Sequence, residues 1–267
     1  MKATELFKLF TRPKRTPFTE ADESVLALAT EHQLIADGHR LTGWVWGKRG
    51  PRVLLVHGWE SKAAQMGAFV LPLTQAGMQV IAFDGPAHGL SDGDSSSVIH
   101  FGRALAAIGR EIASLDAVVA HSVGSPATLY AMRAGLRLKT SVHIAGPASF
   151  ERVLHWAAQM AELPPAEFGE FRMLVEQFTG EAVSTMELEH LSMALSRPGL
   201  IMHDPQDRQV PFAESTALHG AWPISTLLPI PGAGHKRMLE HPAVVKAVVD
   251  HMVKTLHVSA DRVQGAA

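Results

Sequence analysis

The amino-acid sequence predicts an α/β protein: a mostly parallel, twisted sheet of about eight strands, with helices on both faces and a helical cap insertion. Short apolar runs rich in β-branched residues alternate with longer amphipathic segments, and this alternation is typical of βαβ units in a parallel sheet. The alternation breaks once, over a helical stretch rich in Met and Phe, and then resumes, so we expect a cap there. Hydrophobic content of 46% in a chain of 267 residues supports a well-buried core.

The chain is long enough for one large α/β domain with additions, and too short for two full-sized enzymatic domains. We expect an N-terminal helical extension over residues 1–30 and a helical cap over residues 148–196. The core then consists of residues 31–147 and 197–257. A polar or small-residue tail over 258–267 is expected to be flexible.

The N-terminal extension begins with a short amphipathic helix, which a basic cluster follows. The apolar face of this helix needs a partner, which is its own domain, a second subunit or, by weak adhesion, an anionic membrane surface. A mitochondrial presequence is a further interpretation, which Glu5, Glu20, Asp22 and Glu23 disfavour. The apolar residues are Ala3, Leu6, Phe7 and Phe10, and the basic residues are Arg12, Lys14 and Arg15.

The core elements follow in order. Asp37-Gly38 separates two extended segments, 33–36 and 40–46, and an Asp-Gly pair in that position is a strong hairpin signal. The later strands are nearly continuous apolar runs, as strands buried on both faces should be, and helices separate them. Strands are expected at 52–56, 79–83, 117–120, 141–145, 199–202 and 225–230. Helices are expected at 63–76, 98–113, 127–132 and 241–256, and one more follows the loop 203–211 and ends at about residue 219.

Several strand ends carry polar or turn-forming residues. In parallel sheets, ligands bind at the carboxyl ends of the strands, so these segments should meet at one edge of the sheet. The segments are His57-Gly58-Trp59, residues 84–93, His121-Ser122-Val123 and Gly146-Pro147.

Ser122 stands where a buried strand turns into a helix. Ala120 and Gly124 flank it at two residues on either side, and both are small, as a sharp turn requires. This is the nucleophile-elbow pattern with alanine in the first glycine position. A serine hydroxyl needs a base, and the base needs a third group that orients it. Asp207 and His235 follow the next two strand ends, which gives the chain order Ser, Asp, His.

These segments together resemble the α/β-hydrolase fold superfamily, over residues 38 to 256. Four parts of the chain carry the resemblance. They are residues 53–59 with the HGW turn, residues 84–93 with the pattern D-x-P-x-H-G-x-S-x-G, the elbow at 120–124, and the loops that hold Asp207 and Gly234-His235.

The resemblance implies a role for each of these residues. It implies Ser122 as the nucleophile, His235 as the general base and then the acid, and Asp207 as the residue that orients His235. It also implies an oxyanion hole formed by the backbone N–H groups of Trp59 and Val123. The family's H-x-x-x-D-x-x-V-P spacing favours Asp207 over its competitor Asp204. A serine in the nucleophile position argues against the dehalogenase and epoxide hydrolase branches, which use a carboxylate.

Other side chains near these segments receive smaller roles. Trp59, His121 and Trp156 are the candidate contacts with the substrate, and apolar cap residues predict an apolar pocket. His57, His88 and His121 lie within the turn motifs and are interpreted as structural hydrogen-bonding or pocket-edge residues rather than catalysts. Two further residues of these turns, Asp84 and Ser91, are expected to hold the turn by hydrogen bonds to neighbouring backbone.

The sequence therefore predicts a serine hydrolase that cleaves a carboxylic ester or thioester of a small, largely apolar substrate through an acyl-enzyme intermediate. Two alternatives stay open. One is another acyl or C–C bond hydrolase on the same triad, including lactonase, amidase or acyltransferase action. The other is a non-catalytic ligand-binding protein of this fold, since fold alone does not determine function.

Composition excludes several other classes. A net charge of −2 gives no general basic field for nucleic acid, and the absence of cysteine excludes disulfides and thiol catalysis. The histidines form no H-E-x-x-H pattern or tight cluster, so neither a metal nor another cofactor is expected. No apolar run of about 18 residues and no signal-peptide pattern occurs, and we expect a cytoplasmic protein. The expected partner is a small-molecule substrate, with a homo-oligomer possible.

Overall fold

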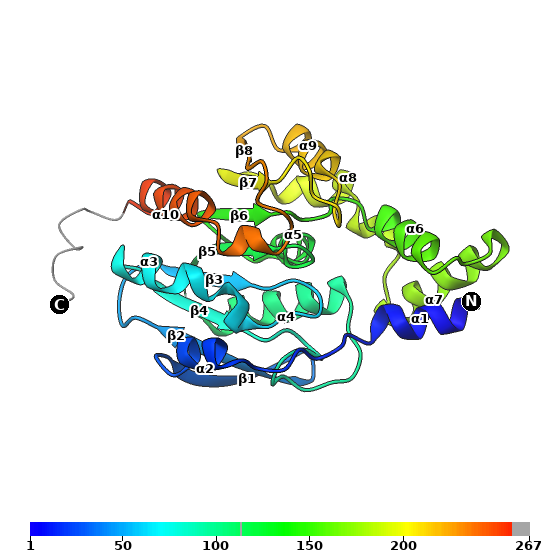
Figure 1. Ribbon diagram of the computed structural model, residues 1–267, viewed down its shortest axis with the longest axis horizontal. Helices are drawn as coiled ribbons and strands as arrows, with labels where there is room; N and C mark the ends of the chain where they lie inside the picture. The colour runs from blue at the N-terminus through cyan, green and yellow to red at the C-terminus, as the bar shows by residue number, and fades with distance from the viewer. Residues whose placement is uncertain (113, 258–267) are drawn as a thin grey trace.

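An eight-stranded sheet runs through the middle of the molecule (Figure 1). The computed structural model describes residues 1–112 and 114–257, so the predicted tail lies outside the described residues. The strand order is β1-β2-β4-β3-β5-β6-β7-β8. The first two strands are antiparallel to their neighbours, and the pairs from β4 to β8 are parallel. The predicted fold class is confirmed, whereas the limits of the extension, core and cap stay a prediction.

The strands are β1 (Thr30–Ala36), β2 (His39–Trp46), β3 (Arg52–Val56), β4 (Gln79–Phe83), β5 (Leu115–His121), β6 (Thr140–Ile144), β7 (Gly199–His203) and β8 (Ser225–Pro229). The α-helices are α1 (Ala3–Thr11), α2 (Glu20–Leu26), α3 (Val70–Gln75), α4 (Val98–Glu111), α5 (Gly124–Arg133), α6 (Phe150–Met160), α7 (Phe168–Thr179), α8 (Leu188–Leu191), α9 (Phe212–Ala221) and α10 (Pro242–Leu256). Five 3-10 helices, η1 (Ala63–Phe69), η2 (Pro165–Glu167), η3 (Val183–Met186), η4 (Ser192–Ala194) and η5 (Arg237–Leu239), complete the described elements.

The predicted hairpin joins β1 to β2. Its turn residues Asp37 and Gly38 have φ angles of 49° and 76°, and Ala36 pairs with His39. Two positive φ angles in succession define the turn that matches the twist of a tight hairpin, and Asp-Gly tolerates them. The hairpin prediction is therefore confirmed.

The predicted helix over 63–76 is partly wrong. Residues 63–69 form the 3-10 helix η1, and only residues 70–75 form the α-helix α3. Pro72 has no backbone N–H, so the bond from residue 72 to the carbonyl of Ala68 that a continuous α-helix requires cannot form. A 3-10 segment before α3 avoids that defect.

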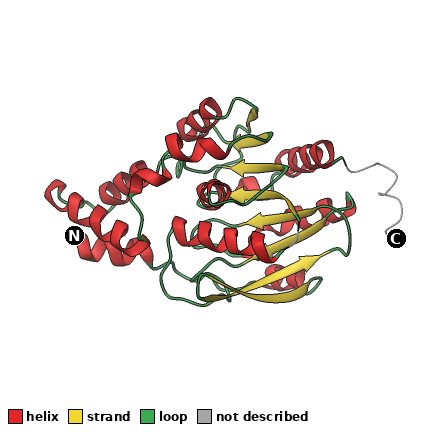
Figure 2. Cartoon of the chain, turned by 180° about the vertical axis from the view of Figure 1, so that it is seen from behind, coloured by secondary structure: helices red, strands yellow, loops and turns green. Residues whose placement is uncertain are grey.

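Helices cover both faces of the sheet, as Figure 2 shows from the side opposite to Figure 1. Alternate strand residues point to opposite faces. Ile81 and Val118 pack into one core cluster with α4 and α5, and Val80 and Val119 pack into another with η1, α3 and α10. The strands therefore have apolar residues on both faces, which explains their nearly continuous apolar sequences.

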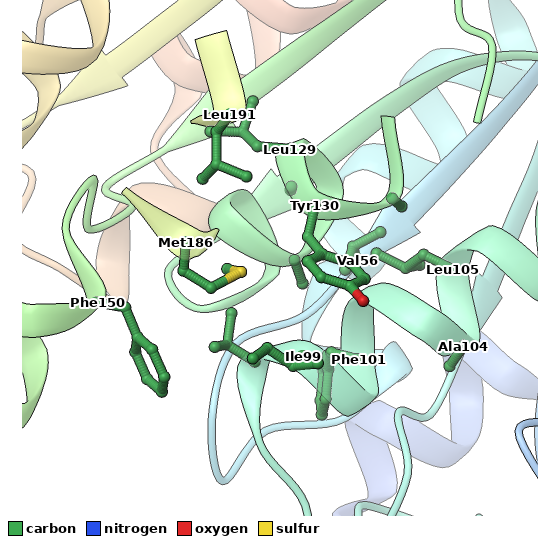
Figure 3. Close-up of a cluster of buried hydrophobic side chains, with 14 of the residues drawn as sticks. Val56, Ile99, Phe101, Ala104, Leu105, Leu129, Tyr130, Phe150, Met186 and Leu191 are labelled. Carbon is green, nitrogen blue, oxygen red and sulfur yellow. The ribbon is translucent and has the colours of Figure 1, made fainter. Parts of the chain in front are cut away.

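The elements from α6 to η4 lie between β6 and β7 in the chain and form a helical layer beyond the strand ends (Figure 1). Phe150 of α6 and Met186 of η3 belong to the same buried cluster as Ile99 and Phe101 of α4 and Val56 of β3 (Figure 3). This layer is thus joined to the core by continuous apolar contact.

Helix α1 packs against α6 and α7, at the end of the molecule where the N-terminus lies (Figure 1). The Phe7 ring meets Phe178 edge-on with centroids 5.7 Å apart, and Phe10 meets Phe171 in the same way at 5.5 Å. The backbone N–H of Ala3 donates to the carboxylate of Glu167, which lies in η2 directly before α7, at 2.8 Å. The apolar face of this helix is therefore docked on its own chain.

Across the described ranges, none of the helices combines the length and the apolar character needed to cross a membrane.

Candidate active site

Ser122 lies at the corner between β5 and α5 with a φ angle of 52°. A positive φ is unusual for a residue with a side chain, and an observed strain of this kind is typical of functional positions. The backbone N–H of Ser122 donates to the carbonyl of Ile144 on β6 at 2.9 Å, which fixes the corner against the neighbouring strand. The predicted strand-to-helix turn is present.

Gly124 has to be a glycine. A Cβ atom at this position would lie 2.7 Å from the carbonyl oxygen of His57 and 2.8 Å from that of Val56, closer than real Cβ contacts. Ala120, which replaces the first glycine of the pattern, is fully buried on β5 with its methyl group in the core cluster. The elbow therefore tolerates a methyl group on the strand side and none on the helix side.

The loops after β7 and β8 bring an acid and a base to this serine. Nε2 of His235 lies 3.1 Å from the Ser122 hydroxyl oxygen, and Nδ1 of His235 lies 2.6 Å from Oδ2 of Asp207. The side chain of Asp207 is fully buried, and that of His235 is 5% exposed. With Nδ1–H donating to the carboxylate, Nε2 is the free acceptor for the hydroxyl proton, the tautomer that a general base needs.

A second histidine also donates to Asp207. Nε2–H of His203 donates to Oδ2 of Asp207 at 3.1 Å and to the carbonyl of Val210 at 3.0 Å, and its Nδ1 accepts from the hydroxyl of Ser215 at 2.7 Å. Burial alone would raise the pKa of Asp207. The hydrogen bonds from His203 and His235 outweigh burial and hold this pKa well below the usual range of a carboxyl group, so Asp207 stays ionised.

Asp204, the competing acid, has a different set of contacts. Its carboxylate accepts from the backbone N–H groups of Gln206, Gly232 and Gly234, at 2.9, 3.2 and 2.6 Å. The last two belong to the loop that carries His235. Asp204 thus shapes this loop, and Asp207 is the acid that reaches the imidazole.

Two histidines link the loop after β3 to the loop after β4. His57 of the first loop accepts at Nε2 from the backbone N–H of Gly85, 2.8 Å away, and His88 of the second loop accepts at Nε2 from that of Glu60, 3.1 Å away. Their Nδ1–H groups donate to the carbonyls of Gly58 and Pro86. These bonds hold the turn that carries Trp59, so the structural role expected for both histidines is present.

Asp84 and Ser91 stabilise the loop after β4. The Asp84 carboxylate accepts from the N–H groups of Ala63 and Leu90, and the Ser91 hydroxyl donates to the carbonyl of Asp84. Burial raises the pKa of Asp84 to about 6, although these N–H groups oppose the rise. Both residues hydrogen-bond to backbone as predicted.

The backbone N–H groups of Trp59 and Val123 lie at the two turns beside the serine. The turns touch, because a Cβ atom on Gly58 would lie 2.9 Å from Cβ of Ser122. Among the residues that the structure describes, neither N–H has a hydrogen-bond acceptor, although the next N–H in the first turn, that of Glu60, does. Two free donors next to a strained serine are what an oxyanion hole requires.

His121 packs against His235 and hydrogen-bonds to its backbone. Its Nε2–H donates to the carbonyl of His235 at 3.1 Å, and the two rings lie 4.8 Å apart. Its Nδ1 is buried and has no hydrogen-bond partner within the part of the chain that the structure describes. Burial, and next the proximity of His235, lower the pKa of His121 to about 3, so the ring is neutral.

Two cavities meet at Trp59. The cap cavity, about 540 Å³, lies between the strand ends, α1 and α6, and the histidine-side cavity, about 570 Å³, lies on the other side of Trp59. The lining of the cap cavity includes Leu6, Leu9, Phe10, Trp59, Val123, Phe150, Val153 and Ala157. The lining of the histidine-side cavity includes Asp22, Trp59, Glu60, Lys62, His121, Ser122, Gln209, His235 and Lys236.

Of the three predicted substrate contacts, Trp59 lines both cavities and His121 lines the histidine-side cavity. Trp156 lies on α6 with a partly buried side chain and lines neither, so its position does not support the predicted contact. Its neighbours Val153 and Ala157 do line the cap cavity. The sequence indicated the helix but not which of its sides faces the cavity.

No group of three or more His, Asp or Glu side chains that could hold a metal ion occurs within residues 1–112 and 114–257. Asp207, His203 and His235 form a buried cluster of titratable groups. Both histidines donate hydrogen bonds to Oδ2 of Asp207.

The comparisons with known proteins concern the family and the fold. A sequence model of the alpha/beta hydrolase family matches residues 53–248, which is most of the chain. The chain therefore belongs to the alpha/beta hydrolase family, and by class it is a hydrolase. A comparison with curated proteins found no match.

Solved structures of similar fold include three esterases or thioesterases. An esterase from Pyrococcus furiosus is 19% identical, with 92% of this chain and 99% of that chain covered and a TM-score of 0.70. Est1E from Butyrivibrio proteoclasticus, with ferulic acid bound, is 18% identical, with 85% and 99% covered and a TM-score of 0.65. The thioesterase domain from the curacin biosynthetic pathway is 15% identical, with 84% and 99% covered and a TM-score of 0.62. At these identities the similarity concerns the fold.

Buried histidines make the fold sensitive to acid. Burial lowers the pKa of His57, His121 and His143 to about 3 each, whereas an unfolded histidine titrates near 6.5. The unfolded chain therefore binds more protons below pH 6.5, and the free energy of unfolding should fall as the pH drops from 6.5 towards 3. Each histidine contributes a slope of about 1.4 kcal/mol per pH unit.

Urea denaturation at a series of pH values measures this slope. The variant His143→Gln should lower this slope by about 1.4 kcal/mol per pH unit, because one fewer proton is taken up on unfolding. The exposed His190→Gln is the control and should leave the slope unchanged. Equal slopes in wild type and His143→Gln would contradict the assignment.

Proposed function

We propose that this hydrolase is a serine esterase or thioesterase that cleaves a carboxylic ester or thioester of a small, largely apolar acyl compound through an acyl-enzyme intermediate. The observation that carries the proposal is the unbroken chain of hydrogen bonds from Asp207 through His235 to Ser122. The free N–H groups of Trp59 and Val123 beside this chain and the apolar lining of the cap cavity support it.

The proposed mechanism has two half-reactions. Ser122 Oγ attacks the carbonyl carbon of the substrate while its proton passes to Nε2 of His235. The substrate's carbonyl oxygen becomes negative and accepts hydrogen bonds from the backbone N–H groups of Trp59 and Val123. The bond to the alcohol or thiol breaks, and the leaving group takes the proton from Nε2. Water then attacks the acyl-serine, gives a proton to His235, and releases the carboxylic acid as Ser122 recovers its proton. Ionised Asp207 stabilises the imidazolium in both halves.

Fluorophosphonate labelling tests the proposal directly. A fluorophosphonate phosphonylates a serine that a neighbouring base activates, with loss of fluoride. The wild-type protein should therefore gain one adduct at Ser122 and lose p-nitrophenyl acetate hydrolysis in step. The variant Ser184→Ala, which changes an exposed hydroxyl that lines neither cavity, should label like the wild type. A correctly folded wild-type protein that stays unlabelled would favour the alternative, a non-catalytic ligand-binding protein of this fold.

Amides, lactones and C–C bonds are the alternative substrates on the same residues. Parallel turnover assays with p-nitrophenyl, thioester and anilide forms of one acyl group separate them. We expect the ester and thioester to be cleaved fastest.

A further inference from the structure

The two cavities differ in chemical character. The cap cavity is lined almost wholly by aliphatic and aromatic side chains, with Ser97 and Ser149 as the hydroxyl-bearing exceptions. The histidine-side cavity contains carboxylates, ammonium groups and an amide, among them Glu60, Gln209 and Lys236. An ester that occupies both cavities, one on each side of Trp59, would therefore place one half in apolar and the other half in polar surroundings.

The chemistry of the histidine determines which half is which. The proton that His235 takes from Ser122 has to reach the leaving oxygen or sulfur, so the leaving group must lie on the side of His235. His235 and Ser122 line the histidine-side cavity, whereas the cap cavity is lined by Trp59 and Val123, whose N–H groups are free. The acyl chain is thus directed into the cap cavity, and the alcohol or thiol into the polar one.

The N-terminal segment, residues 1–26, supplies walls to both cavities. Met1, Leu6, Leu9 and Phe10 line the cap cavity, and six residues between Thr16 and Val25 line the histidine-side cavity. This segment precedes residues 53–248, the part matched by the family's sequence model. The cavities are therefore shaped by a part of the chain that the family match does not include.

A buried lysine fastens this segment to the site. The side chain of Lys62 is only 2% exposed, and its ammonium group lies 2.9 Å from Oδ2 of Asp22 and 4.4 Å from the centre of the Phe18 ring. The same group donates to the carbonyl of Pro17. Burying an ammonium group is costly unless it is paired in this way, so the segment and Lys62 stabilise each other.

Arg15 adds a second attachment, on the loop after β4. Its guanidinium donates to the carbonyls of Ser91 and Gly93, both at 2.8 Å, and to that of Gly89. Together with the aromatic contacts of α1, these bonds place the segment as a fixed wall.

We propose that the N-terminal segment is a specificity-determining part of the substrate site. The site takes an amphipathic ester or thioester, with the apolar acyl chain in the cap cavity against α1 and a polar leaving group in the histidine-side cavity. This inference rests on the proposed function and adds the orientation and polarity of the substrate.

Two isomeric esters test the orientation. Ethyl octanoate and octyl acetate have the same atoms, but the long chain is on the acyl side in the first and on the alcohol side in the second. Each buried methylene is worth about a four-fold change in equilibrium, so kcat/KM for ethyl octanoate should exceed that for octyl acetate by more than about ten-fold. A preference for octyl acetate, or equal rates, overturns the proposed orientation.

Matched variants test the walls of the cap cavity. Leu9→Trp and Ala157→Trp place an indole in the cavity from α1 and from α6, and each should lower the octanoate-to-acetate ratio of kcat/KM for p-nitrophenyl esters by about ten-fold. Lys8→Trp and Gln159→Trp are the controls, since Lys8 and Gln159 are exposed on the same helices and line neither cavity. An unchanged octanoate-to-acetate ratio in Leu9→Trp overturns the role of α1.

Failure of the inference can be told from failure of the proposed function. One outcome is that fluorophosphonate labels Ser122 and p-nitrophenyl acetate is hydrolysed, but neither acyl length nor the cavity variants change kcat/KM. In that case the proposed orientation is wrong, and the proposal of a serine hydrolase is retained. If Ser122 is not labelled in folded protein, the proposed function itself fails.

Discussion

Replacement of Ser122 by alanine should lower kcat/KM for p-nitrophenyl esters by about 10⁶-fold, close to the rate without a nucleophile. The reason is that the remaining hydrogen-bond chain has no hydroxyl to deprotonate, so the acyl-enzyme cannot form. Stopped-flow detection of the p-nitrophenolate burst measures this loss, because the burst reports the acylation step.

The control for this variant is structural. Ser122 has a φ angle of 52°, which alanine adopts with similar strain, so the melting temperature should stay close to that of the wild type. Hydrolysis that persists in a folded, homogeneous Ser122→Ala protein would show that another residue is the nucleophile.

Replacement of Asp207 by asparagine should lower kcat by about 10⁴-fold. An amide in this position lets the histidine adopt the wrong tautomer, with the proton on Nε2, and it provides no negative charge to stabilise the imidazolium. It also removes the acceptor that His203 contacts at 3.1 Å. Steady-state kinetics between pH 5 and 9 measure the loss.

Asp204→Asn is the matched control, since the same chemical change is made three residues earlier. The carboxylate of Asp204 accepts hydrogen bonds from three backbone N–H groups and does not contact His235. Its replacement should therefore mainly lower the free energy of unfolding. The loss of a buried charge-assisted hydrogen bond is worth about 2 kcal/mol. If Asp204→Asn were the more damaging of the two to kcat in folded protein, the acid would be misassigned.

Much of this arrangement follows from local sequence. Parallel strands buried on both faces need apolar residues throughout, and sharp turns need glycine, alanine or proline at fixed places, so strands and loops could be predicted from their order. The chain order of Ser122, Asp207 and His235 then indicated which strand ends would meet. Their roles stay predictions that the kinetic experiments above test.

The rest depends on distant contacts that no local pattern encodes. His203 is the first residue of the spacing that indicated Asp207, yet its hydrogen bond to that carboxylate depends on Ser215, which lies on the following helix. Lys62 looks in the sequence like an ordinary surface lysine, and only the fold reveals its partner Asp22. Trp156 lies on α6, but the residues of this helix that line the cap cavity are Phe150, Val153, Ala157 and Met160, so its contact with a substrate stays a prediction.

The contact between Ala3 and Glu167 spans 164 residues. On the ribosome, which adds about 5 to 20 residues per second, the helix that carries Ala3 emerges roughly 8 to 30 seconds before its docking surface exists. During that interval its apolar face has no partner within the chain. Helix α1 is therefore synthesised well before the surface on which it docks, and a nascent chain acquires the α1 wall of its cap cavity only after α7 has been made.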